Sequence, residues 1–133
     1  MSKVIYENKS GFIQYEMPYK LLYAEYIGLA RTNQIEDLLR KVLFFTENGN
    51  ISHLIINLKN MQGAFSGSTN YIENDFYPIM TKNGTVSLSL IVSKDVFTNF
   101  TLKSIKIRSN RELKIRTFCD LEDAKNWVKF ISR

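Results

Sequence analysis

The chain has very few of the side chains on which metal, redox and nucleophilic chemistry depend. It contains one cysteine, Cys119, and one histidine, His53, among 133 residues. A lone thiol cannot form a disulfide within the chain, which is typical of a reducing compartment, and a lone imidazole cannot provide a two-histidine metal site. We expect an inert thiol at the end of an edge strand and an imidazole at a strand end or in a loop. No metal, cofactor or catalytic residue is therefore predicted, and we expect a protein that is not an enzyme.

Long hydrophobic runs are also missing. The first ten residues, MSKVIYENKS, lack the apolar segment of a secretory signal, and no apolar run approaches the length of a membrane span. Apolar residues make up 44% of the chain and charged residues 23%, which is typical of a globular protein. Because the chain also lacks repeats and low-complexity tracts, we expect one domain over residues 1–133. The single cysteine and the missing apolar runs lead us to expect a cytoplasmic protein without a membrane span.

Basic residues are concentrated in the last third of the chain, although the net charge is only +5. Residues 1–93 contain eight basic and eight acidic side chains, whereas residues 94–133 contain ten and five. A basic surface can bind nucleic acid or an acidic partner, but a solvated edge or connecting segment explains the pattern more simply. We do not expect nucleic-acid binding, because no aromatic–glycine pattern accompanies the charges. The densest stretch, 102–116, carries the basic residues Lys103, Lys106, Arg108, Arg111, Lys114 and Arg116.

Alternating apolar residues predict several strands. Residues 11–17 alternate, and residues 21–27, beyond Pro18, are rich in aromatic and aliphatic side chains, which predicts an antiparallel pair joined by a turn. Residues 54–58 are apolar except for Asn57, which predicts a central strand covered on both faces. Further strands are predicted at 4–7, 86–92 and 113–119, the last of them an edge strand with Lys114 and Arg116 pointing outward.

Helices are predicted in four segments. Residues 33–48 have one apolar face, with Asn33 and Glu36 spaced as a capping pair. Residues 69–83 form a second helix that Pro78 should kink, and a short irregular helix is expected over 97–106. Asp120 caps the last helix, whose apolar stripe consists of Leu121, Ala124, Trp127, Val128 and Ile131.

The order of these elements predicts an α/β fold. An antiparallel hairpin comes first, and strands then alternate with helices, which requires crossover connections between parallel strands. We therefore expect a single mixed β-sheet flanked by helices. Its exposed edges are compatible with a homodimer, but no residue specifies one.

One junction between a strand and a helix is rich in hydroxyl groups. The stretch HLIINLKNMQGAFSGSTNYI, residues 53–72, places Ser66, Ser68 and Thr69 between the central strand and the second helix. These hydroxyls can shape the turn and cap the helix, which is the simpler interpretation. A phosphate there would instead add about −1.5 to −2 charges and could switch the binding of a partner. Ser66 is the hydroxyl we would test first.

The same stretch resembles the STAS domains of anti-sigma-factor antagonists similar to SpoIIAA. The resemblance places Ser66 at the serine that a partner kinase phosphorylates in that family. The phosphoswitch pattern is degenerate here, because Phe65, Gly67 and Ser68 depart from the family's Asp-Ser-Ser-Gly order. The whole chain looks most like small stand-alone SpoIIAA-like (STAS/SEC14-like) proteins, many of them from Bacteroidetes. The motifs that it shares with them are DFYP at 75–78, SKDVF at 93–97 and FCDLEDAKNW at 118–127, which imply a kink, a strand exit, a helix cap and a core tryptophan.

The resemblance implies a non-enzymatic regulatory or protein-interaction domain with a protein partner that the sequence does not identify. The alternative is a small-molecule or lipid-binding module of the SEC14-like type. Open α/β sheets bind ligands beyond the carboxyl ends of their strands, so such a pocket is expected there. Its predicted lining residues are Phe65, Tyr71, Ser87, Ser89 and Phe97.

Overall fold

The computed structural model describes residues 2–29, 31–48, 50–62, 69–94 and 113–132. Its first half contains β1 (Ser2–Asn8), β2 (Gly11–Glu16), a 3-10 turn (Met17–Tyr19), β3 (Leu21–Leu29) and α1 (Thr32–Thr46). The second half contains β4 (His53–Gln62), α2 (Thr69–Tyr71), a π-helical turn (Ile72–Phe76), α3 (Tyr77–Lys82), β5 (Ser87–Ile91), β6 (Lys114–Phe118) and α6 (Leu121–Ile131).

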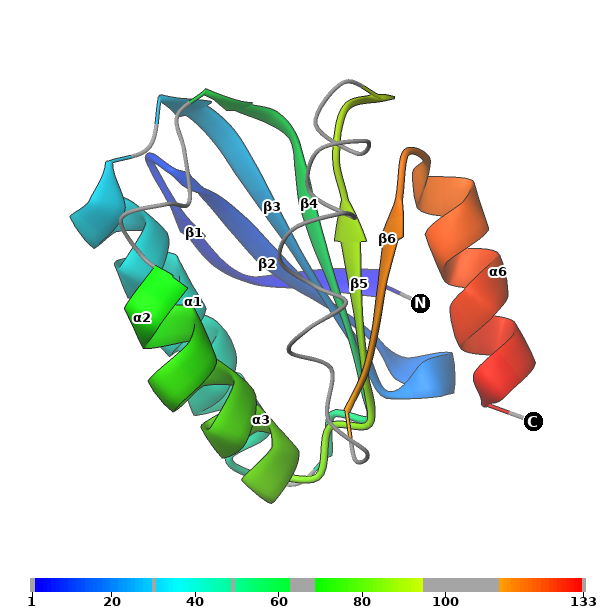
Figure 1. Cartoon of the computed structure of the whole chain (residues 1–133). Helices are drawn as coiled ribbons and strands as arrows, with labels where there is room; N and C mark the ends of the chain where they lie inside the picture. The colour runs from blue at the N-terminus through cyan, green and yellow to red at the C-terminus, as the bar shows by residue number, and fades with distance from the viewer. Residues whose placement is uncertain (1, 30, 49, 63–68, 95–112, 133) are drawn as a thin grey trace.

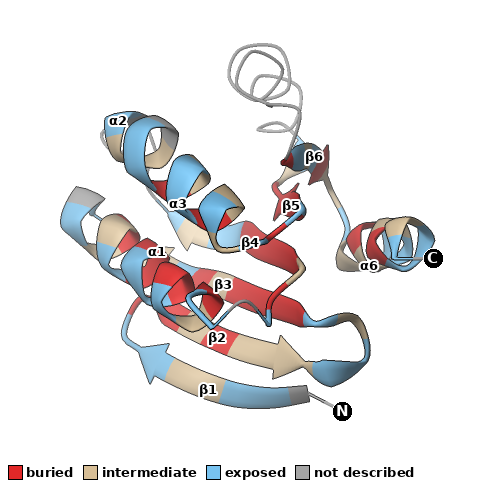
Figure 2. Cartoon of the chain, turned by 90° about the horizontal axis from the view of Figure 1, so that it is seen from below, coloured by how far each residue is buried: buried red, intermediate tan, exposed pale blue. Residues whose placement is uncertain are grey.

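The described strands form one mixed sheet in the order β1-β2-β3-β4-β5-β6. The pairs β1–β2 and β2–β3 are antiparallel, whereas β3–β4, β4–β5 and β5–β6 are parallel. Helices α1, α2 and α3 lie on one face of this sheet, and α6 lies on the other beside β5 and β6 (Figures 1 and 2). The predicted α/β fold with a mixed sheet is confirmed.

The two faces of the sheet differ in chemistry. Side chains alternate along a strand, so neighbouring residues of β4 and β5 point to opposite faces. We call the side beneath α1 and α3 the apolar face, because the buried side chains that β4 and β5 contribute to it are aliphatic: Leu54, Ile56, Leu58, Leu88 and Leu90. The opposite side, which we call the α6 face, receives His53, Ile55, Asn57, Ser87, Ser89 and Ile91.

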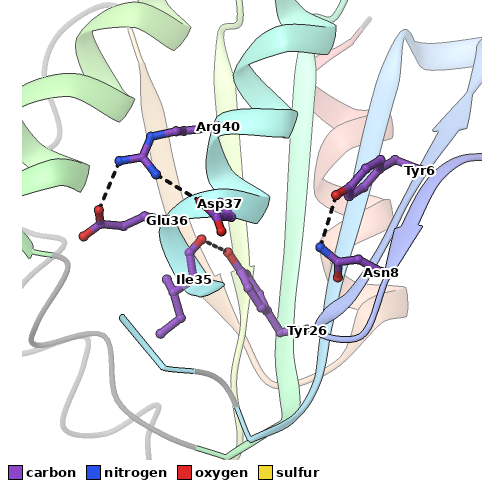
Figure 3. Close-up of polar contacts among 7 residues, drawn as sticks. All are labelled: Tyr6, Asn8, Tyr26, Ile35, Glu36, Asp37 and Arg40. Atoms are coloured by element: carbon purple, nitrogen blue, oxygen red, sulfur yellow. Dashed lines mark hydrogen bonds and ion pairs between the residues drawn. The ribbon is translucent and has the colours of Figure 1, made fainter. Parts of the chain in front are cut away.

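Helix α1 covers the predicted segment, but its cap differs from the prediction. The backbone N–H of Arg31 donates to Oε1 of Gln34 at 2.9 Å, so the helix is capped from Arg31, two residues before Asn33. Glu36 instead pairs with Arg40 at 3.3 Å, one turn further along the helix (Figure 3). The Asn33–Glu36 capping pair was therefore wrong. The buried hydroxyl of Tyr26 on β3 donates to the carbonyl of Ile35 at 2.5 Å and fixes this helix start against the sheet (Figure 3).

The disturbance predicted at Pro78 takes the form of a wider helical turn. Pro78 has no N–H to donate. The turn before it is π-helical, and the N–H of Tyr77 donates to the carbonyl of Ile72, five residues earlier. Wider turns of this kind insert one residue into a helix without ending it. The short helix expected over 97–106 lies outside the described residues.

The last helix begins as the sequence predicts. Oδ1 of Asp120 accepts the N–H of Glu122 at 2.7 Å, and Ala124 and Val128 are buried against the sheet. Trp127 is only half-buried, with its ring centroid 5.8 Å from that of Phe118. The expectation of a core tryptophan was therefore wrong, because α6 lies beside the edge strand β6 and its tryptophan packs at the margin of the sheet.

Candidate functional site

Buried polar side chains of the central strands gather on the α6 face. His53 and Asn57 of β4, and Ser87 and Ser89 of β5, are all less than a tenth exposed. All of these except Ser89 form side-chain hydrogen bonds, in two places at opposite ends of the parallel strands. We call these the amino-edge cluster, made of His53, Ser87 and Ser132, and the carboxyl-edge cluster, made of Tyr23, Glu25, Asn57 and Asn60.

The carboxyl-edge cluster is a chain of hydrogen bonds between β3 and β4. Nδ2 of Asn57 donates to the hydroxyl oxygen of Tyr23 at 2.9 Å, and that hydroxyl donates to Oε1 of Glu25 at 2.5 Å. Nδ2 of Asn60 donates to Oε2 of Glu25 at 3.3 Å. Both carboxylate oxygens are therefore held by neighbouring side chains, which orients the carboxylate at this end of the sheet.

A β-bulge in β4 brings the two asparagines to the same face. In the β3–β4 register, Glu25 pairs with Asn57 but Ile27 pairs with Asn60, so β4 has one additional residue. Asn57 stabilises this bulge, since its Oδ1 accepts the backbone N–H of Lys59 at 3.0 Å. Without the bulge, positions 57 and 60 would point to opposite faces.

The electrostatics keep Tyr23 protonated. Burial raises its pKa well above the ordinary range, and the hydrogen bond to Glu25 raises it further, while the bond from Asn57 acts in the other direction. A phenol in this state donates a hydrogen bond and is a poor base or nucleophile. The cluster can therefore orient polar groups for recognition.

Exposed side chains surround this cluster. Ile27 and Leu29 follow Glu25 at alternate positions of β3, and they are 46% and 65% exposed. Ile27 pairs with Asn60 in the register of the sheet, and Lys59 and Asn60 are themselves exposed. We call Ile27, Leu29, Lys59 and Asn60 the carboxyl-edge surface. It combines apolar side chains with fixed polar groups.

The amino-edge cluster holds the histidine in one tautomer. Its Nδ1 lies 2.7 Å from Oγ of Ser87, and its Nε2 lies 2.9 Å from Oγ of Ser132. Ser132 donates its own hydroxyl hydrogen to the carbonyl of Val128 at 2.7 Å, so it must accept from Nε2–H. Nδ1 then accepts from Ser87. Burial lowers the pKa of His53, which is consistent with a neutral imidazole.

The predicted ligand pocket is not assembled by its described members. Ser87 and Ser89 lie on the α6 face, whereas Tyr71 packs on the apolar face with the Arg40 guanidinium 4.9 Å from its ring centre. Ser87 instead binds His53. Ser89 is fully buried, and its hydroxyl has no hydrogen-bond partner among the residues that the structure describes. Both serines lie beneath α6, which packs against this strand.

The structure describes three further predicted site residues: Thr69, Lys114 and Arg116. Thr69 is the first residue of α2. Of the basic stretch, Lys114 and Arg116 lie on β6 and are exposed, and Arg116 lies 5.5 Å from the ring centre of Phe118 and 5.9 Å from that of Trp127. The remaining predicted site residues lie outside the described part of the chain: Phe65, Ser66, Ser68, Phe97, Lys103, Lys106, Arg108 and Arg111.

An apolar cavity lies between the α2–α3 helix and the sheet. Its volume is about 30 Å³, which is enough for a water-sized probe and far too small for an acyl chain. This cavity therefore gives no support to the lipid-binding alternative. Its lining includes Leu39, Ile56, Leu58, Ile72, Phe76 and Leu88.

The described residues contain no group of three potential His, Cys, Asp or Glu ligands for a metal ion. Within the same ranges, no helix has the length and apolarity required to cross a membrane. Cys119 follows the carboxyl end of β6, whereas His53 begins β4 at the amino edge. The two residues therefore do not form a Cys–His couple.

No protein-family model and no curated protein matches the chain. Among solved structures, the chain is similar to an uncharacterised protein of the DUF3478 family with a SpoIIAA-like fold from Shewanella loihica PV-4. The two are 12% identical, the TM-score is 0.52, and the match covers 96% of this chain and 92% of that one. The chain therefore has a SpoIIAA-like fold, as its resemblance to that group predicts. At this identity, the likeness concerns the fold alone.

Proposed function

We propose that the chain is a non-enzymatic interaction domain that recognises a protein partner through the carboxyl-edge surface. The observation that carries this proposal is the position of two exposed apolar side chains, Ile27 and Leu29, beside the hydrogen-bonded carboxyl-edge cluster. Protein interfaces commonly combine an apolar centre with polar groups that are already oriented. The neutral phenol of Tyr23 and the buried imidazole of His53 support a binding role over a catalytic one.

The resemblance to anti-sigma-factor antagonists supports a regulatory role for the same surface. Ser66, Ser68 and Thr69 follow Gln62, the last residue of β4, within seven positions. A phosphate on one of them would add negative charge close in the sequence to Lys59 and Asn60, and would change the charge that a partner meets. Ser66 is our first candidate for such a switch.

Introducing a charge at an exposed apolar position tests the proposed surface. The Leu29→Asp variant should lose a protein that wild type retains from native lysate, because a carboxylate would be buried in the interface. Phe130→Asp is the matched control, since Phe130 is 67% exposed and Leu29 is 65% exposed, and Phe130 lies on α6. The proposal predicts loss with the first variant alone. Equal retention or equal loss in both variants would contradict it.

The phosphoswitch is tested separately. Intact-mass analysis of the protein from its native source should show a phosphorylated fraction that disappears in the Ser66→Ala variant. A phosphate mapped to another residue, or no phosphorylated fraction, would contradict the phosphoswitch at Ser66. Neither result would bear on the docking surface, which the Leu29→Asp variant tests.

A further inference from the structure

An open depression lies at the amino ends of the parallel strands, at the edge of the sheet opposite the carboxyl-edge surface. It has a volume of about 540 Å³, which is within the usual range for small-molecule sites. The 3-10 turn, the start of β4 and the end of α6 all contribute to it. Its lining includes Tyr19, Lys20, Ser52, His53, Lys129 and Ser132.

Lys20 has an unusual backbone conformation at this depression. Its φ of 51° and ψ of 49° lie in the left-handed region, which lysine rarely adopts and glycine adopts freely. The carbonyl of Lys20 accepts the N–H groups of Ser52 at 2.9 Å and His53 at 3.3 Å, so the turn is tied to the start of β4. Strained residues of this kind are concentrated at functional sites.

The depression is basic. Lys20 and Lys129 are both exposed, the lining contains no acidic residue, and no ion pair joins either lysine to a carboxylate in the described ranges. Tyr19 and Ser52 add hydroxyl groups. His53 and Ser132, which also line the depression, are hydrogen-bonded to each other.

We propose that this depression binds a phosphate-bearing ligand, held by the ammonium groups of Lys20 and Lys129 and by the hydroxyls of Tyr19 and Ser52. Two lysines act as separate point charges and suit a compact dianion, whereas planar carboxylates are more often bound by the fork of an arginine. The phosphate can belong to a soluble ester or to a lipid headgroup. This site is independent of the proposed protein-docking surface.

Calorimetric titration with inorganic pyrophosphate, at constant ionic strength, tests the site in the full chain. Lys20→Gln and Lys129→Gln should each weaken binding about tenfold, the usual loss for one charge-assisted hydrogen bond. Lys3→Gln, which changes the net charge equally on exposed β1, should leave binding unchanged. Sedimentation with phosphatidylcholine vesicles, with and without phosphatidate, forms the second arm.

Pyrophosphate binding that depends on both lysines supports a soluble phosphate ligand. Binding only to phosphatidate vesicles, with the same dependence, assigns the phosphate to a lipid headgroup. Absence of binding in both arms, or equal weakening by Lys3→Gln, would overturn the site.

Lys20→Gly separates binding from structure. Glycine removes the ammonium group and relieves the left-handed backbone, so this variant should keep or raise the unfolding temperature while losing pyrophosphate affinity. A variant that keeps its affinity would show that Lys20 has no part in the site.

Discussion

The two faces of the central sheet differ in chemistry although the same two strands, β4 and β5, contribute to both. On the apolar face, the buried side chains of β4 and β5 are aliphatic, and α1 and α3 cover them. On the α6 face, the same strands carry His53, Asn57, Ser87 and Ser89, all of them buried. On the α6 face, helix α6 lies beside β5 and β6 (Figure 2).

This difference suggests that the two faces have different tasks. The apolar face stabilises the fold by excluding water from aliphatic surface. The polar groups of the α6 face instead form two separate sets of hydrogen bonds. At the amino edge they bond to one another around His53, and at the carboxyl edge they end beside exposed Ile27, Leu29 and Asn60.

The largest effect is expected on the apolar face. Ile56→Ala removes a buried side chain from the centre of the core and should lower the free energy of unfolding by about 2–5 kcal/mol. Urea denaturation measures this loss. Ile79→Ala, at an exposed position of α3, is the control and should cost much less. Similar losses for the two variants would mean that the apolar face is not the principal core.

A smaller loss is expected at the amino-edge cluster. Ser87→Ala removes the hydroxyl that donates to Nδ1 of His53 and leaves that buried nitrogen without a donor. The free energy of unfolding should fall by about 1–3 kcal/mol, the usual cost of a buried polar atom left unbonded. Urea denaturation at pH 7.5 measures it, and no change would contradict the assigned hydrogen bond.

The stability should depend on pH through the same histidine. Burial lowers the pKa of His53 in the folded state, and Lys20 and Lys129 line the same depression as this imidazole. As the pH falls below the ordinary histidine value of about 6.5, the unfolded chain takes up a proton before the folded chain does, so stability decreases. Above that pH this contribution is fully present. Denaturation curves at pH 7.5, 6.5 and 5.5 would show it.

His53→Gln is the control for this pH dependence. Because the chain contains one histidine, the variant should lose most of the slope between pH 7.5 and 5.5. An unchanged slope would assign the dependence to other groups.

The smallest effect is expected at Ser89, two residues from Ser87 on the same strand and face. Its buried hydroxyl has no partner among the described residues, so Ser89→Ala should change stability by less than about 0.5 kcal/mol or increase it. Comparison of the two alanine variants therefore separates a bonded serine from an unbonded one. A loss at Ser89 as large as that at Ser87 would show that Ser89 has a partner.

Periodicity predicted the strands, the main helices and the mixed sheet, because alternation and helical stripes are local signals. The hydrogen-bond partners were not predictable in this way. His53 meets Ser132, 79 residues away, and Asn57 meets Tyr23, 34 residues away, so both contacts depend on the assembled sheet. The bulge that aligns Asn60 with Asn57 depends on a register shift that no pattern in β4 indicates. The polar residue Asn57 within an apolar strand was the one feature of the sequence that could have indicated a buried hydrogen bond there.

The central claim, that a partner docks at the carboxyl edge, is tested most directly by photocrosslinking. A benzophenone side chain placed at Lys59, on the carboxyl-edge surface, should yield one discrete protein adduct that Leu29→Asp abolishes. The same group at Lys82, exposed at the end of α3 before β5 begins, should yield none. No adduct at position 59, or the same adduct from both positions, would contradict the account.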